Sequence, residues 1–90
     1  MTKLGTSDHK TLIGLLKATR IKAGLRQVDV AEKLGVPQSM ISKYELGERR
    51  IDVLELRDIC SVIGISFPDF VEELEVLLDK VKNETEPKVS

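Results

Sequence analysis

The stretch QVDVAEKLGVPQSMISKYEL, residues 27–46, decides the fold of this chain. Its apolar residues recur at helical spacing on either side of a glycine: Val30, Ala31, Leu34, Val36, Ile41 and Tyr44. Gly35 tolerates the positive φ that a sharp turn requires, and Pro37 pre-sets φ for the start of a helix. The pattern therefore predicts a helix over 27–34, a tight turn and a second helix over 38–46.

Three further helices are expected around this pair. One spans 8–23 and ends at a glycine. The next follows Asp52, whose spacing from Glu55 is that of a capping box, and ends at Gly64. The last follows Ser66 and carries apolar residues close to a seven-residue repeat: Phe67, Phe70, Val71, Leu74, Leu77, Leu78 and Val81. Because no strand pattern occurs, the expected fold class is all-α with five helices.

The chain is long enough for one small domain, which we expect over 8–82. Residues 1–7 show no period and are expected to form a flexible arm, and the polar stretch 83–90 a disordered tail. Cys60 is the single cysteine, so no disulfide can form within the chain and a reducing compartment is expected. With neither a signal peptide nor an apolar run of about 20 residues, we expect a cytoplasmic protein without a membrane partner.

Charge is distributed unevenly along the chain, although the formal net charge is only −1. Up to Arg50 there are ten basic and five acidic residues, a net +5, and from Ile51 onward four basic and ten acidic ones, a net −6. This asymmetry indicates a basic working face and an acidic remainder. His9 is the only histidine, and no nucleophile–base pair or metal-ligand set can be assembled. We therefore expect no enzyme, and no metal, cofactor or small-molecule ligand.

Eleven positions give the chain a family resemblance: Gly24, Gln27, Ala31, Gly35, Val36, Gln38, Ser39, Ile41, Ser42, Glu45 and Gly47. Together they resemble the Cro and lambda-repressor-type (XRE-type) helix-turn-helix family, over about residues 12–74. A small residue at Ala31 lets the two helices cross closely, which fits that family's geometry. The resemblance implies a lambda-repressor-like DNA-binding domain and a stand-alone transcriptional regulator that binds double-stranded DNA.

In that family the second helix of the pair enters the DNA major groove. This places four residues as candidate base contacts: Gln38, Ser39, Met40 and Ser42. The Gln38 amide can bond both N6 and N7 of adenine, while Met40 is expected to project outward, either against a thymine methyl or into solvent. Five residues are candidate phosphate contacts, either at the start of the first helix of the pair or on and beyond the second: Gln27, Arg26, Lys43, Arg49 and Arg50.

The resemblance also implies a buried ion pair between Arg20 and Glu45 that joins the first and third helices. Two positions depart from the family. Arg26 stands where a capping Ser, Thr or Asn is usual, and we interpret it as added phosphate affinity. Pro37 likewise replaces a capping side chain before the recognition helix and starts that helix through its fixed φ.

A DNA-binding protein with a single helix-turn-helix gains affinity by forming a dimer. Two recognition helices about 34 Å apart then reach successive major grooves of a palindromic operator. The last helix offers more apolar surface than a small domain needs, so we expect a homodimer with four leading contacts: Phe70, Leu74, Leu77 and Leu78. The same helix could instead fold onto its own core. The alternative function is a protein-interaction module, such as an antitoxin or adaptor, with weak or no DNA binding.

Overall fold

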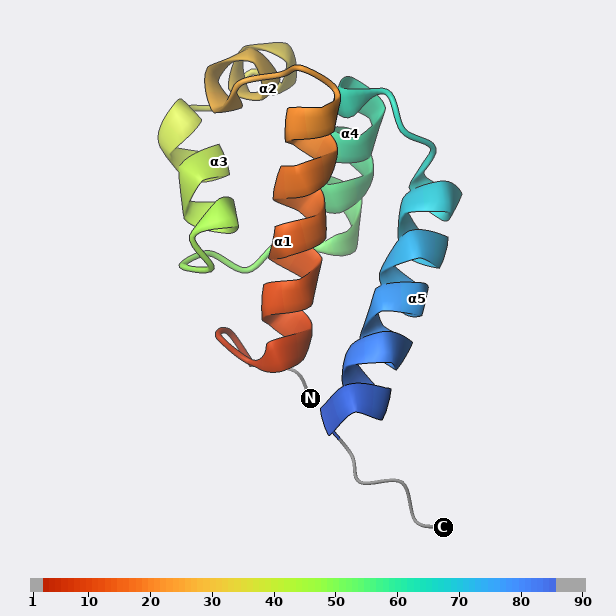
Figure 1. The fold of residues 1–90 in the computed structure, drawn as a ribbon. Helices are drawn as coiled ribbons and strands as arrows, with labels where there is room; N and C mark the ends of the chain where they lie inside the picture. The colour runs from red at the N-terminus through yellow and green to blue at the C-terminus, as the bar shows by residue number, and fades with distance from the viewer. Residues whose placement is uncertain (1–2, 86–90) are drawn as a thin grey trace, which may run out of the picture.

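The computed structural model describes residues 3–85, with side chains up to residue 80, and contains five helices within that range (Figure 1). In chain order these are α1 (Ser7–Lys22), α2 (Gln27–Leu34), α3 (Gln38–Glu45), α4 (Val53–Ile63) and α5 (Phe67–Thr85). No strand occurs among the described residues. The predicted all-α, five-helix fold is confirmed.

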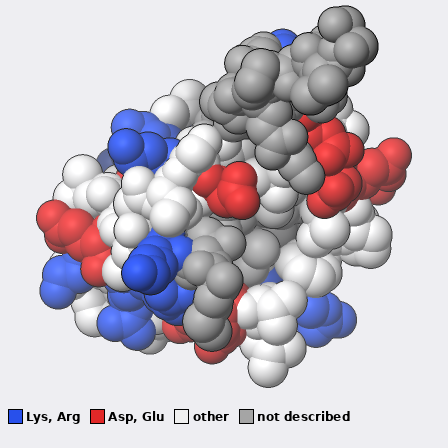
Figure 2. Space-filling view, turned by 90° about the horizontal axis from the view of Figure 1, so that it is seen from below, with Lys and Arg blue, Asp and Glu red and all other residues white. Residues whose placement is uncertain are grey.

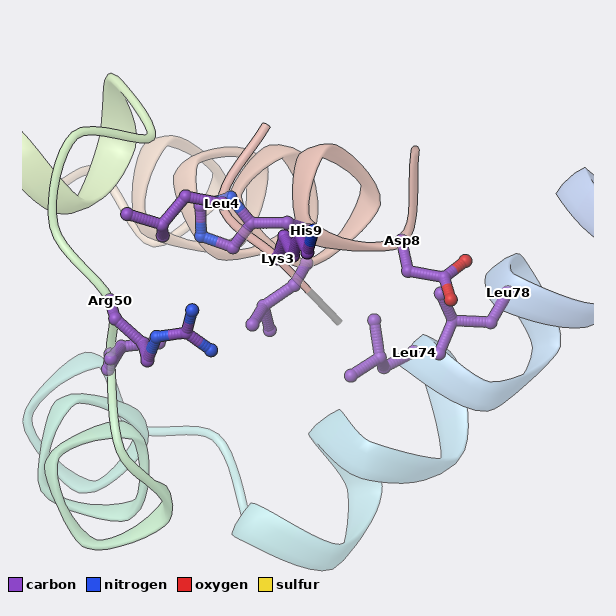
Figure 3. A pocket seen from close by; sticks show the side chains of 9 residues that line it. Lys3, Leu4, Asp8, His9, Arg50, Leu74 and Leu78 are labelled. Carbon is purple, nitrogen blue, oxygen red and sulfur yellow. The ribbon is translucent and has the colours of Figure 1, made fainter. Parts of the chain in front are cut away.

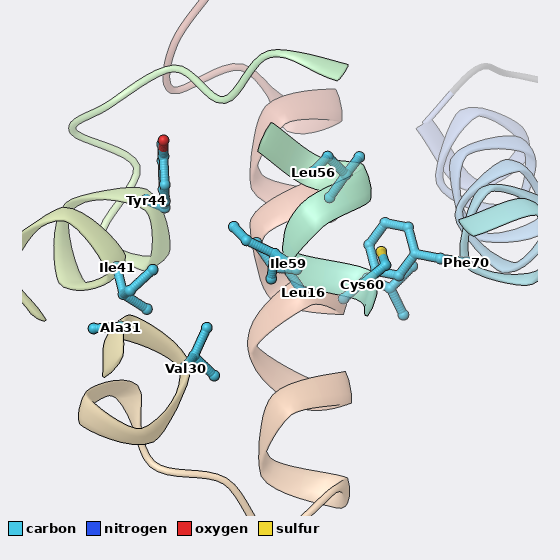
Figure 4. Packing of buried hydrophobic residues seen from close by; sticks show 10 residues of the cluster. Leu16, Val30, Ala31, Ile41, Tyr44, Leu56, Ile59, Cys60 and Phe70 are labelled. Carbon is cyan, nitrogen blue, oxygen red and sulfur yellow. The ribbon is translucent and has the colours of Figure 1, made fainter. Parts of the chain in front are cut away.

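α1 runs through the middle of the domain, with α2 and α3 on one side and α5 on the other, while α4 lies behind it (Figure 1). The core forms where these helices meet, and ten buried apolar residues make it: Leu15, Leu16, Val30, Ala31, Ile41, Tyr44, Leu56, Ile59, Cys60 and Phe70. Figure 4 shows Ile41 and Tyr44 of α3 on the side that faces Ile59 of α4. The predicted apolar stripes of α2, α3 and α4 therefore supply one shared core.

The turn between α2 and α3 is made as the sequence indicates. Gly35 has φ 72°, in the left-handed region that a side chain would strain, and it ends α2. The Val36 N–H then donates to the Ala31 carbonyl at 3.0 Å, and the Val36 side chain packs against the core. The backbone bond closes the end of α2, and the packing of Val36 holds the turn between the two helices against the core.

α1 begins at Ser7, one residue earlier than expected, because Thr6 caps it. The Thr6 hydroxyl oxygen accepts from the His9 N–H at 3.3 Å, and the hydroxyl donates to the Lys3 carbonyl at 2.9 Å. Of the expected arm 1–7, residues 3–6 thus form a turn that leads into α1, and residues 1–2 lie outside the described range.

The last two helices begin as their capping signals indicate. Asp52 and Glu55 form the expected capping box, with the Glu55 N–H bonded to Asp52 at 2.8 Å and the Asp52 N–H bonded to Glu55 at 3.0 Å. Ser66 caps α5 by accepting from the Asp69 N–H at 3.3 Å. α5 continues through Thr85, so 83–85 of the expected tail are helical, and 86–90 lie outside the described residues. No helix in residues 3–85 is both long and apolar enough to cross a membrane.

Candidate nucleic-acid interface

α3 presents its polar side to solvent. Gln38, Ser39 and Lys43 are exposed and Ser42 is half-buried, while Ile41 and Tyr44 take the inward face. Three of the four expected base contacts therefore lie where a nucleic acid could reach them. The expected base contacts themselves stay predictions.

Met40 does not project outward, and that prediction is wrong. Its side chain is half-buried, packs against the core, and borders a groove with Leu34 and Val36. The physical reason is helix geometry: Met40 lies one turn before the fully buried Tyr44, on the edge of the inward face. The Met40 side chain therefore contributes to the packing of the core and not to the solvent-exposed face of α3.

Leu46 is a surface residue that sequence reasoning missed. It follows α3 as the C-cap residue and leaves 66% of its surface exposed, although it is a large apolar side chain. Its spacing of four from Ser42 and seven from Ser39 places it on the outward face of α3. This spacing, which is visible in the sequence, predicts an outward-facing side chain. The sequence prediction uses Leu46 only as the last residue of the helix.

Glu45 connects three segments of the motif. Both of its oxygens are held by the Arg20 guanidinium, with Nε to Oε2 at 2.7 Å and Nη2 to Oε1 at 2.8 Å. Gln27 Nε2 donates to the same Oε1 at 3.1 Å, and Arg20 Nη1 donates to the Leu25 carbonyl at 2.8 Å. Both charged side chains are buried, 10% and 4% exposed, and the bonds to Glu45 raise the pKa of Arg20. α1, the start of α2 and the end of α3 are thereby held as one unit.

Arg26 already has a partner within the protein. Its Nε and Nη2 donate to the two Asp29 carboxylate oxygens at 3.1 and 2.9 Å, and its backbone N–H donates to Asp29 at 2.8 Å. The hydrogen bond from the Arg26 side chain, and to a smaller extent the one from its backbone N–H, lower the pKa of Asp29 to about 2. Asp29 thus performs the capping that the Arg26 side chain cannot, and the guanidinium keeps Nη1 for another acceptor.

Tyr44 joins α3 to α4 and to the loop between them. Its buried hydroxyl donates to Glu55 Oε2 at 2.7 Å, and the Arg49 guanidinium lies over its ring, 5.6 Å from the centroid. Burial and the bond to Glu55 raise the pKa of Tyr44, against the smaller opposite effect of Arg49. Arg49 is therefore exposed to solvent but positioned by an aromatic side chain of α3.

The basic side chains of this region gather on one side of the molecule. Figure 2 looks from the end at which α1 begins, and most Lys and Arg on this face lie toward the α3 side, with the largest acidic group toward α5. Lys43, Arg49 and Arg50 are all exposed to solvent. On this face the basic side chains are therefore more frequent near α3 than near α5.

α5 uses part of its apolar surface within the protomer. Phe70 is fully buried and lies beside Cys60 of α4 (Figure 4), so it has no surface to offer a second copy and is withdrawn as a dimer contact. Leu74 and Leu77 pack against the core from half-buried positions. Val71 lies one position further round the helix than Phe70 and is exposed, and Leu78 is half-buried.

The fold and this arrangement define a helix-turn-helix protein: a short helix, a left-handed glycine turn, and a second helix with an exposed polar face. A family model of helix-turn-helix proteins matches residues 16–70. The structure is similar to that of an XRE-family like protein from Pseudomonas syringae pv. tomato str. DC3000, with 39% sequence identity and a TM-score of 0.75. That similarity covers 79% of this chain and 87% of the other.

A tyrosine-to-phenylalanine variant of the restriction-modification controller protein C.Esp1396I has a similar fold, with a TM-score of 0.76 at 24% identity. The similarity covers 83% of this chain and 95% of that one. The search of curated proteins found no match. From the family match and the Pseudomonas relative, the chain belongs to the XRE-type helix-turn-helix family, which is a family of DNA-binding transcriptional regulators rather than of enzymes.

Proposed function

We propose that this regulator binds a palindromic operator as a homodimer and reads its sequence with α3. Gln38 and Ser39 stand at the N-terminal end of α3, the end that faces base edges in this class of motif. The amide of Gln38 can bond N6 and N7 of adenine together, and the hydroxyls of Ser39 and Ser42 can bond any base. Leu46, on the same face, adds an apolar side chain that suits a thymine methyl.

The observation that carries the proposal is the Glu45 junction. Gln27 stands at the start of α2, where free backbone N–H groups and the helix dipole favour a phosphate, and its side chain is bonded to Glu45 at the end of α3. A phosphate bound at Gln27 would therefore set the position of the reading helix, because Arg20 holds Glu45 in place.

The remaining phosphate contacts surround this junction. Lys43 and Arg49 are exposed on and just beyond α3, and Arg50 follows them in the loop. Arg26 contacts a phosphate through Nη1 while its other edge stays with Asp29. Each of these contacts adds affinity without sequence preference.

The proposed dimer surface is a stripe of α5 whose side chains the core of the protomer covers only in part or not at all. Val71, Leu74 and Leu78 lie three and four residues apart and are exposed or half-buried. Pairing this stripe with its copy across a two-fold axis would give two α3 helices for two half-sites.

Selection of bound duplexes from a random pool tests the proposal. We expect an enriched inverted repeat, whose half-sites are centred about 10 base pairs or a multiple of that apart. Gln38→Ala should change the enriched bases more than the total bound fraction, while Lys10→Ala, on the exposed surface of α1, should change neither. If no sequence is enriched from the pool, the proposal that this protein recognises a specific DNA sequence is contradicted.

A protein-interaction module is the second candidate, and one observation favours it. Val53 and Leu54 at the start of α4 are 63% and 68% exposed, close in sequence to the exposed Leu46. Such a surface suits a protein partner more than a phosphate backbone. If the selection returns no duplex and Leu54→Lys abolishes capture of a specific partner protein, this function replaces the first.

A further inference from the structure

His9 is a buried polar residue at the start of α1, next to two other segments of the chain. Its side chain is only 7% exposed, and its Nδ1 accepts from the Gly5 N–H, in the turn before α1, at 3.2 Å. The loop after α3 also approaches the ring, since a Cβ placed on Gly47 would lie 3.8 Å from His9 Cε1 and 3.2 Å from Ile13 Cδ1. The imidazole therefore lies next to both the N-terminal turn and the loop that leaves the recognition helix.

The hydrogen bond from Gly5 requires the neutral form of the His9 ring. A ring nitrogen that accepts carries no hydrogen, so the single hydrogen of the neutral ring is on Nε2. Nε2 is buried without a hydrogen-bond partner, and it is the only such side-chain nitrogen or oxygen in the part of the chain that the structure describes. The site thus supplies one donor to the ring and no acceptor to either of its nitrogens.

A second proton on the His9 ring does not fit this arrangement. It would bind Nδ1, which would then direct one N–H at the N–H of Gly5, so the only hydrogen bond of the ring would be lost. The cation would be buried with no acceptor for either N–H, which is strongly unfavourable. Protonation therefore favours a conformation in which the ring leaves its site and reaches water.

The charged neighbours of His9 do not stabilise a cation on the ring. Three charged side chains line a pocket together with His9 (Figure 3): Lys3, Asp8 and Arg50. Lys3 is positive and disfavours a second cation. In Figure 3 the Asp8 carboxylate extends toward Leu78 of α5, away from the His9 ring.

The loop after α3 and α5 supply no acceptor either. Arg50 is positive and makes an interaction of its own within the protein. Glu48, which follows Gly47, is exposed to solvent. Of the described residues of α5, only Leu74 and Leu78 share the pocket lining, and both are apolar. A protonated ring in this position would therefore have no carboxylate partner among the described residues.

We propose that His9 is a pH-dependent switch. The neutral ring holds the N-terminal turn on α1 and supports the loop after α3, and the protonated ring releases the turn and withdraws from the loop. His9 is the only histidine of the chain, and histidine is the side chain that ordinarily changes charge between about pH 5 and 8. Because the loop carries cations of the proposed phosphate contacts, acid weakens DNA binding, a consequence that rests on the proposed function.

Nuclear magnetic resonance of the unmodified full chain tests the switch. At about pH 7.5 the ring ¹⁵N signals should show hydrogen on Nε2, and the Gly5 amide should be rigid, with an order parameter of about 0.85. When the ring signals report the second proton, the Gly5 order parameter should fall below about 0.6, while the amide of the buried Val30 stays rigid. Hydrogen on Nδ1 of the neutral ring, or a Gly5 amide that stays rigid beside a protonated ring, overturns the proposal.

His9→Asn is the matched variant, because its Oδ1 takes the place of Nδ1 as the acceptor for Gly5 and does not titrate. The Gly5 amide of the variant should stay rigid over the same pH range, and far-ultraviolet circular dichroism checks that the variant is folded. Equal loss of rigidity in both proteins would assign the change to another group and overturn the proposal. If the variant does not fold, the unmodified chain decides, because ring and amide are observed in one sample.

Binding to the selected duplex at about pH 7.5 and about pH 5.5, at one salt concentration, measures the effect on DNA. From the higher to the lower pH, the association constant of the unmodified chain should fall about fivefold or more relative to that of His9→Asn. An equal pH dependence of the two proteins overturns the regulatory role of His9. Absent binding at both pH values contradicts the proposed operator binding instead, since the magnetic resonance readouts contain no DNA.

Discussion

At the scale of single residues, the helix-turn-helix depends on side chains that face inward from its ends. Arg20 and Glu45 are joined by two hydrogen bonds at 2.7 and 2.8 Å and are almost completely withdrawn from water. Removing one partner of such a pair leaves a buried charge without compensation. This lowers the free energy of unfolding far more than the loss of a surface ion pair does. The motif is therefore more sensitive at this pair than at any of its exposed cations.

Arg20→Ala should lower the free energy of unfolding by about 3 to 5 kcal/mol, because it leaves the Glu45 carboxylate buried with only Gln27 as donor. Urea denaturation followed by circular dichroism measures the change. Lys17→Ala, an exposed position one turn earlier on α1, serves as the control and should change it by less than about 0.5 kcal/mol. Equal small effects of both substitutions would mean that the ion pair has no structural role.

Asp29 gives a prediction for pH dependence. Its carboxyl has a pKa of about 2 in the folded protein, below the usual value of about 4, so its bonds to Arg26 stabilise the fold above pH 4 and are lost as the pH falls toward 2. Arg26→Gln removes the guanidinium but keeps the backbone N–H, and should raise this pKa part of the way back. Carboxyl-carbon NMR titration reports it directly. An unchanged titration in the variant would assign the whole shift to the backbone.

At the scale of elements, α3 is joined to α4 by a polar contact at the edge of the apolar core. The Tyr44 hydroxyl bonds Glu55, which also caps α4, so one carboxylate fixes the start of α4 and the end of α3. The position of Arg49 follows, because its guanidinium lies over the same ring. The loop that leaves the recognition helix is thereby tied to the core.

Tyr44→Phe should destabilise the fold by about 1.5 to 3 kcal/mol, since the ring stays and only a hydrogen bond to a charged group is lost. Thermal unfolding measures it, and a double-mutant cycle with Glu55→Gln separates the bond from the burial of the ring. A cycle in which the two substitutions simply add would contradict the coupling of α3 to α4.

The helices were largely predictable from the sequence, whereas the directions of side chains at their edges were not. Period and caps placed α2 and α4, because Gly35, Gly64 and Asp52 act through local backbone geometry. Met40 lies at the edge of the inward face of α3, where the helical period does not decide the direction of the side chain and packing against the core does. Phe70 lies in the middle of the buried face of α5, where the sequence pattern alone does not separate packing within the core from contact with a second copy.

Two local features of the structure follow from the spacing of neighbouring residues in the sequence. The spacing of three between Arg26 and Asp29 already indicates a side-chain pair on a helix start, which the sequence interpretation did not use. Thr6 is a favoured capping residue, and it accounts for the ordered turn before α1. The pocket between the turn before α1 and α5 could not have been predicted, because its lining joins segments as distant in the chain as Lys3 and Leu78.

At the scale of the whole molecule, α3 and the acidic α5 lie on different sides of α1, so that α5 stays available for the proposed contact with a second copy when α3 meets DNA. Leu78→Lys should shift the full chain from dimer to monomer at micromolar concentration by placing a charge in the proposed dimer stripe. Sedimentation velocity measures this. Val76→Lys, at a 62% exposed position elsewhere on α5, is the matched control. A monomeric unmodified chain at these concentrations would contradict the dimer.

The salt dependence of binding to the selected duplex tests the central claim most directly. With four cations in each subunit meeting phosphates (Arg26, Lys43, Arg49 and Arg50), a dimer should give a slope of about −7 when the logarithm of the association constant is plotted against that of the salt concentration. Removing Arg49 from both subunits should reduce the slope by about 2. Absent binding, or a slope near zero, would contradict the account of this chain as a DNA-reading regulator.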